Sequence, residues 1–152
     1  MLDKLQKYFD KSPELKVHHI DPSQKNHIIN HATRKGYLVA DLDGKKIPDI
    51  EKLCKEVGEQ MHFPSYYGEN WGAMGECIGD LDWDDDPDWM YGEIAGALVV
   101  IKNFDNFLSK KKDGLSSEFI SLLRVANRDL YSPPDCIEGA KSGRMIKVFI
   151  ID

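Results

Sequence analysis

Acidic and histidine side chains are the residues of this sequence whose spacing could support metal chemistry. Within an Asp-rich run, Asp82, Asp84 and Asp86 take the first, third and fifth positions of a calcium-binding loop. The sixth position of such a loop needs the positive φ that Gly supplies, and Pro87 occupies it, so the spacing does not favour a calcium site. Tight binding of a divalent ion in calorimetry would revive the alternative of a metal-dependent enzyme.

Motifs of enzyme catalysis are absent from the sequence. It contains no Gly-rich phosphate loop, no HExxH and no GxSxG, and its Ser and Cys residues lack an adjacent His pattern. His27 and His31 lie four residues apart on one predicted helix, but nothing nearby supplies a clear third metal ligand, so we expect structural roles for both. The sequence therefore predicts no enzyme activity, no catalytic residue, no metal and no cofactor.

A segment at residues 63–77, FPSYYGENWGAMGEC, has the composition of a binding surface. Two tyrosines precede a predicted helix whose outer face carries three glycines, each about 1 kcal/mol less favourable in a helix than Ala. The glycines are Gly72, Gly75 and Gly79. Close packing of another element of this chain, or of a partner, against the helix backbone would explain why these positions lack side chains. Glu76 and Tyr66 beside this strip are typical of a binding hot spot, while core tyrosines with close internal packing are the alternative.

The charge of the chain is distributed unevenly. The 152 residues include 26 acids and 20 bases, which gives a net charge of −6. Between Glu56 and Ile101 there is no Lys or Arg, and the same span contains eleven acids. A folded protein tolerates such repulsion more readily when a cationic partner neutralises it, although a solvated acidic loop would explain the pattern equally well.

The elements that must position this segment alternate between strands and helices. Apolar runs predict strands at residues 37–42, 97–101 and 145–151, with 15–20 as a candidate fourth. Apolar residues at helical spacing predict longer helices at about 21–35, 49–61, 70–81 and 116–131, the last capped by Ser116 or Ser117. Strands that are apolar throughout and separated by helices indicate an α/β fold with a parallel sheet.

Composition also bears on the location of the protein. Three widely spaced cysteines without a CxxC pair fit reduced thiols better than a disulfide framework. No apolar run approaches the roughly 20 residues of a membrane span, and the charged N-terminus does not read as a signal peptide. We therefore expect a cytoplasmic protein that does not bind a membrane.

Residues 64–78, PSYYGENWGAMGECI, resemble the signature of the barstar family, the intracellular inhibitors of the secreted ribonuclease barnase and its relatives. The order of the predicted elements matches as well, most strongly over residues 36–80 and more weakly through the last strand. The resemblance implies a barstar-like domain at 36–152, preceded by an N-terminal extension at 1–35 that packs on it. It also implies a parallel sheet of three strands, with 15–20 as the candidate fourth, packed with helices.

The resemblance further implies that the segment from Tyr66 through the following helix plugs the active site of the target. In the family, a tyrosine at the position of Tyr66 contacts the enzyme. An acid at the position of Glu76 occupies the site of the substrate phosphate, where charge-assisted hydrogen bonds are strong. Asn70 and Gly79 also match contact or loop-shaping positions.

Several departures from the family pattern argue against tight inhibition of barnase itself. Glu76 replaces the usual shorter Asp, and Gly72 and Gly75 stand where the ribonuclease inhibitor has an acid and a tryptophan. Val125 stands where that inhibitor carries another acid. The Asp80–Asp88 loop could supply compensating charge to a different toxin.

The sequence thus predicts an intracellular immunity protein that binds and occludes the active site of a basic toxin, with a ribonuclease as the leading candidate. The alternative is a protein–protein interaction module of the same fold that binds a basic surface of another partner. We expect no direct contact with nucleic acid, and we assume a monomer. The predicted contact residues are Tyr66, Tyr67, Asn70, Trp71, Gly72, Gly75, Glu76, Gly79 and Asp80, with Asp82, Asp84, Asp85 and Asp86 as additional acidic contacts.

Overall fold

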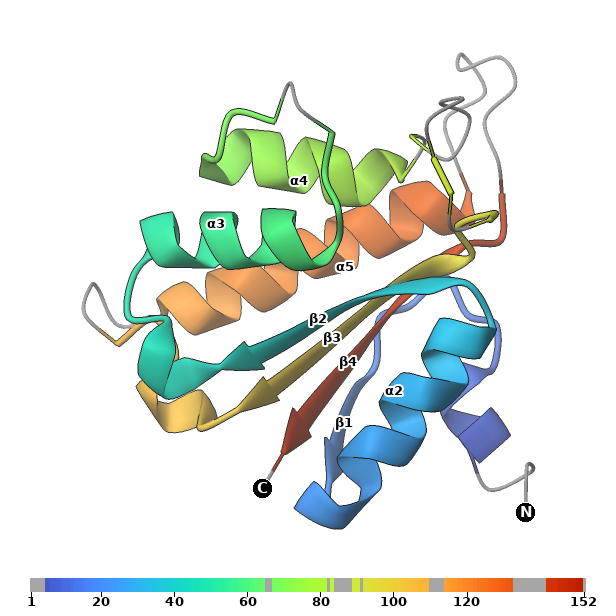
Figure 1. Ribbon diagram of the computed structural model, residues 1–152, viewed down its shortest axis with the longest axis horizontal. Coiled ribbons are helices and arrows are strands. Elements are labelled where there is room, and N and C mark those ends of the chain that lie inside the picture. Colours follow the sequence, from blue (N-terminus) through green and yellow to red (C-terminus); the bar gives the residue numbers. More distant parts are fainter. Residues whose placement is uncertain are drawn as a thin grey trace.

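Four parallel strands form the centre of the protein in the computed structural model, which describes residues 5–64, 67–81, 83, 89–90, 92–109, 114–132 and 142–151 (Figure 1). The strands are β1 (Val17–Ile20), β2 (Tyr37–Asp43), β3 (Gly96–Lys102) and β4 (Met145–Ile151). Their order in the sheet is β1-β4-β3-β2, and all pairs are parallel. The predicted α/β fold is confirmed, and the candidate fourth strand is present as β1, with Val17 opposite Val148.

Helices cover both faces of this sheet (Figure 1). Three helices lie on one face: α3 (Ile50–Gln60), α4 (Trp71–Asp80) and α5 (Leu115–Tyr131). On the other face lie α2 (Lys25–Arg34) and the short 3₁₀ turn η1 (Lys7–Phe9). Further 3₁₀ turns are η2 (Pro22–Gln24), η3 (Gly44–Lys46) and η5 (Phe104–Asn106).

The central strands β3 and β4 are mostly apolar because both of their faces are buried, and the one buried lysine of these strands, Lys147, donates to the carbonyl oxygen of Asp10. Successive side chains of a strand point to opposite faces, so Val99 and Val148 join the cluster under α3, α4 and α5. Leu98 and Phe149, which are fully buried, face the other way. There they meet residues of the first 34, namely Phe9, Ile20, Ile28 and Ala32. The first part of the chain therefore supplies half of the sheet's cover.

Local capping explains where the helices begin. The side chain of Asp49 accepts the backbone N–H of Lys52 at 2.9 Å, so α3 begins at the next residue, Ile50. α5 begins after Gly114, whose φ of +92° is left-handed, and no side chain caps it. The prediction of a Ser116 or Ser117 cap is therefore wrong, because a glycine turn sets the start of this helix.

Within the described ranges, no helix combines the length and the apolar character needed to cross a bilayer.

Candidate partner-binding site

The outer face of α4 is a bare strip with two carboxylates. Gly72, Glu76 and Asp80 are exposed and follow one another at every fourth position, so they lie along one side of the helix. The opposite side carries Met74 and Ile78, which are fully buried. α4 lies outermost among the helices of its face, packed over α5 and beside α3 (Figure 1). The carboxylate of Glu76 is therefore held on a helix that presents its free side to solvent.

The three glycines of α4 serve two different purposes. A Cβ added to Gly75 would lie 3.4 Å from Cδ1 of Leu122, so this glycine allows α5 to pack closely. A Cβ on Gly72 would meet only Oδ1 of Asn70, at 3.5 Å, and one on Gly79 would have no atom of the described residues within 4 Å. Internal packing explains Gly75, but it does not explain why Gly72 and Gly79 lack a side chain.

Tyr67 and Trp71 turn inward and hold the start of α4. The hydroxyl of Tyr67 donates to the carbonyl oxygen of Cys54 at 2.9 Å, and its ring lies against Phe63 with centroids 4.8 Å apart. Gly58 makes room for this ring, since a Cβ there would come within 2.5 Å of it. The half-buried Trp71 ring meets Phe119 edge-on at 6.4 Å. Tyr67 and Trp71 are thus partly buried against the rest of the chain, and their predicted contacts with a partner stay predictions.

Side chains fix both ends of α4. At its start, Oδ1 of Asn70 accepts the backbone N–H of Ala73 at 2.9 Å, which makes Asn70 the N-cap. At its end, the guanidinium of Arg144 donates to the carbonyl oxygens of Asp80 and Leu81, at 2.6 and 2.5 Å. A cation at this position also interacts favourably with the helix dipole. The role of Arg144 could not be predicted from the sequence, because nothing in its surroundings indicates a partner more than sixty residues earlier in the chain.

An apolar edge from α5 accompanies this strip. Leu122 is half-buried against Gly75, and Val125, one turn later, is 50% exposed. Val125 therefore adds an exposed apolar side chain one turn beyond the contact of α5 with Gly75. Tyr66 and the acidic run Asp82, Asp84, Asp85 and Asp86 lie outside the described residues, so their predicted contacts stay predictions.

Residues with metal-binding chemistry are dispersed. In the part of the chain that the structure describes, no three His, Cys, Asp or Glu side chains are grouped so as to hold an ion. His27 is exposed, whereas His31 is buried with its ring 4.8 Å from that of Phe9, so the two histidines do not form a pair. The side chains of Cys54 and Cys77 are buried.

Comparison with known proteins agrees with this arrangement. Residues 37–150 match the family model of Barstar (barnase inhibitor). A protein of Bacillus subtilis (strain 168) named "Putative ribonuclease inhibitor YrdF" is 26% identical over 89 residues, which cover 59% of this chain and 85% of that protein. Because the family model spans most of the sequence, including α4 and every strand of the sheet except β1, the chain belongs to the barstar family.

Proposed function

We propose that this protein inhibits a cationic ribonuclease toxin by covering its active site with the outer face of α4. The observation that carries the proposal is the exposed Glu76 on a helix face where Gly72 and Gly79 lack side chains. The carboxylate of Glu76 takes the place of a substrate phosphate among the basic residues of the enzyme. The chain acts by stoichiometric binding and catalyses no reaction.

The glycines support this proposal on energetic grounds. Gly in a helix is less favourable than Ala by about 1 kcal/mol. Close packing against described residues does not require a glycine at position 72 or 79, so it does not offset this cost. Close approach of a partner to the backbone at these positions would explain why both residues are glycines. Side chains of the partner would occupy the space beside Gly72 and Gly79. Larger residues at these two positions would fill that space and exclude them.

The charge distribution supports a cationic target. The span from Glu56 to Ile101, which contains α4, has eleven acids and no Lys or Arg. Electrostatic attraction of this kind accelerates association with a basic partner and weakens as salt screens it. We propose that the protein acts in the cytoplasm, where its cysteine thiols stay reduced.

The direct test is a titration of RNA cleavage by the toxin encoded beside this gene. Cleavage is expected to stop when inhibitor and toxin are equimolar, and the association rate is expected to fall as salt is raised. A neighbouring toxin that cleaves RNA equally fast with and without the protein would remove the proposal. If that neighbour is a basic protein without ribonuclease activity and the chain binds it, the interaction-module alternative is favoured.

Two matched variants locate the interface. Glu76→Gln removes one charge from the strip, and we expect a loss of about 2–5 kcal/mol in binding, typical for one partner of a buried charge pair. Glu59→Gln removes one charge from an exposed position of α3 and should leave the affinity nearly unchanged. Both variants should unfold like the parent protein, since both glutamates are exposed. Equal affinities of the two variants would place the interface elsewhere.

A further inference from the structure

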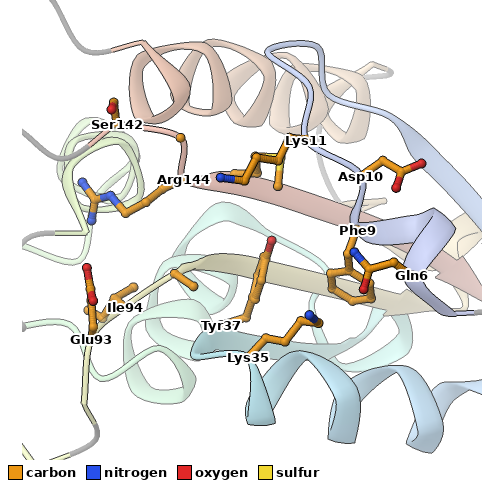
Figure 2. A pocket seen from close by; sticks show the side chains of 13 residues that line it. Gln6, Phe9, Asp10, Lys11, Lys35, Tyr37, Glu93, Ile94, Ser142 and Arg144 are labelled. Atoms are coloured by element: carbon orange, nitrogen blue, oxygen red, sulfur yellow. The ribbon is translucent and has the colours of Figure 1, made fainter. Parts of the chain in front are cut away.

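A cavity of about 690 Å³ lies where the N-terminal extension meets the amino ends of β2, β3 and β4 (Figure 2). Tyr37 and Met145 are the first residues of β2 and β4, and Ala95 directly precedes β3. The opposite wall comes from residues 6–11. Residues 6–11 and Lys35 lie outside the region matched by the barstar family model, so the N-terminal extension completes this cavity.

Tyr37 contributes a hydroxyl group to the lining of this cavity. Its side chain is only 8% exposed, and Figure 2 shows the hydroxyl directed into the space between Lys11 and Phe9. The structure gives this hydroxyl no hydrogen bond to any described residue, and burial raises the pKa of Tyr37 to about 12. The ring is held firmly, since a Cβ on Gly96 would come within 2.9 Å of it. A hydroxyl that lines a cavity and makes no hydrogen bond to a described residue is available to a ligand.

Two lysines bring positive charge to the same space. Neither Lys11 nor Lys35 forms an ion pair with a residue that the structure describes. The ammonium of Lys11 lies 3.7 Å from the position that a Cβ on Gly143 would take, so it reaches over the chain that leads into β4. Arg144 adds a third positive charge to the wall, although its terminal nitrogens already hold the end of α4.

Two acids also line the cavity, and neither occupies its centre. Figure 2 shows the carboxylate of Asp10 directed away from Lys11 and Tyr37. Glu93 is exposed and lies on the side of Arg144 and Ile94. Neither carboxylate therefore lies between Lys11 and Tyr37.

We propose that this cavity binds a small organic anion, with its phosphate or carboxylate group held by the ammonium of Lys11 and the hydroxyl of Tyr37. Hydrogen bonds from a charged donor to an anionic oxygen are about twice as strong as neutral ones. The volume lies in the range of ordinary ligand sites, and a bare phosphate would fill only part of it. This site is separate from the outer face of α4 and does not depend on the inhibitor function.

The test is a calorimetric titration of the full chain with three probes: adenosine 5′-monophosphate, citrate and inorganic phosphate. We expect saturable one-to-one binding of an organic anion, tighter than that of inorganic phosphate, and a thermal midpoint that rises with ligand concentration. Adenosine 5′-monophosphate and citrate distinguish a phosphate from a carboxylate ligand. Absence of saturable binding for all three probes, or equal affinity for inorganic phosphate, would overturn the proposal.

Three variants separate the site from general attraction between charges. Tyr37→Phe keeps the ring and removes only the hydroxyl, and Lys11→Met keeps the length of the side chain. We expect each to weaken binding by roughly ten- to 150-fold, the loss of one hydrogen bond to a charged group. Lys55→Met removes the same charge from an exposed position of α3 and should change nothing. Unchanged affinity in Tyr37→Phe, or equal effects of Lys11→Met and Lys55→Met, would refute the site.

Discussion

Replacing Gly79 with Ala is expected to make the fold more stable and the inhibitor weaker. Gly79 is the second-last residue of α4, and no described atom lies within 4 Å of the Cβ that the substitution adds. Ala also loses less backbone entropy on folding than Gly does. The free energy of unfolding should therefore rise by about 0.5–1 kcal/mol.

The same methyl group would stand on the face that we propose the ribonuclease covers. Extra methyl groups in a closely packed contact cost about 1–3 kcal/mol, which corresponds to a rise in Kd of roughly five- to 150-fold. Stability and affinity would then change in opposite directions. Substitution of a glycine that is needed only for folding would not be expected to raise stability and weaken binding at the same time.

Urea unfolding measures the first effect, and calorimetric titration with the ribonuclease measures the second. Gly72→Ala should behave like Gly79→Ala, because its Cβ would meet only Oδ1 of Asn70, at ordinary contact distance. Gly75→Ala is the matched comparison for stability. Cδ1 of Leu122 lies 3.4 Å from that added Cβ, so the gain in stability should be smaller.

Two results would refute this reasoning. A Gly79→Ala protein that is stabilised and still inhibits the ribonuclease as tightly as the parent would show that no partner approaches the backbone there. A destabilised Gly79→Ala protein would show that the glycine serves the fold, and the energetic argument for a partner would then fail.

Three further predictions concern the fold. Burial, together with nearby positive charges, lowers the pKa of His18 and His31 below 6.5. As the pH drops below about 6.5 the unfolded chain therefore binds more protons than the folded protein, and the free energy of unfolding should fall. An unchanged urea midpoint between neutral pH and pH 5 would contradict this. Tyr67→Phe removes the hydrogen bond to Cys54 and should cost about 1 kcal/mol in urea unfolding, whereas an equal midpoint would mean that this bond contributes nothing. Removal of residues 1–35 uncovers the second face of the central strands, so the remainder should lose cooperative thermal unfolding; a sharp transition would show that it folds alone.

The sheet could be predicted from sequence because its central strands are apolar at nearly every position, with Lys147 in β4 and Lys102 at the end of β3 as the exceptions. Burial on both faces leaves no polar alternation, so the run at residues 145–151 matches β4 at both ends. Asp21 is predicted to begin a helix, and its side chain accepts the N–H of Ser23 and caps the 3₁₀ turn η2, whereas α2 itself begins at Lys25. These signals are local, which is why they can be read without knowing the fold.

The site could be predicted only in part, because its geometry depends on contacts between distant residues. The helical spacing of Gly72, Gly75 and Gly79 places them on similar sides of α4, and only the position of α5 distinguishes Gly75 from the others. In the same way, Tyr67 points inward because Gly58 of α3 leaves space for its ring. Neither neighbour can be identified from the residue types of the segment alone.

The way α4 is held bears on how its outer face can bind. Asn70 fixes the first turn and Arg144 fixes the last, so the helix that carries Glu76 is ordered before any partner arrives. Ordering a flexible loop during association costs free energy, and a preformed helix avoids much of that cost. A single glutamate with few side chains around it can therefore contribute strongly to affinity, because little of its interaction with a basic active site is lost in ordering the chain.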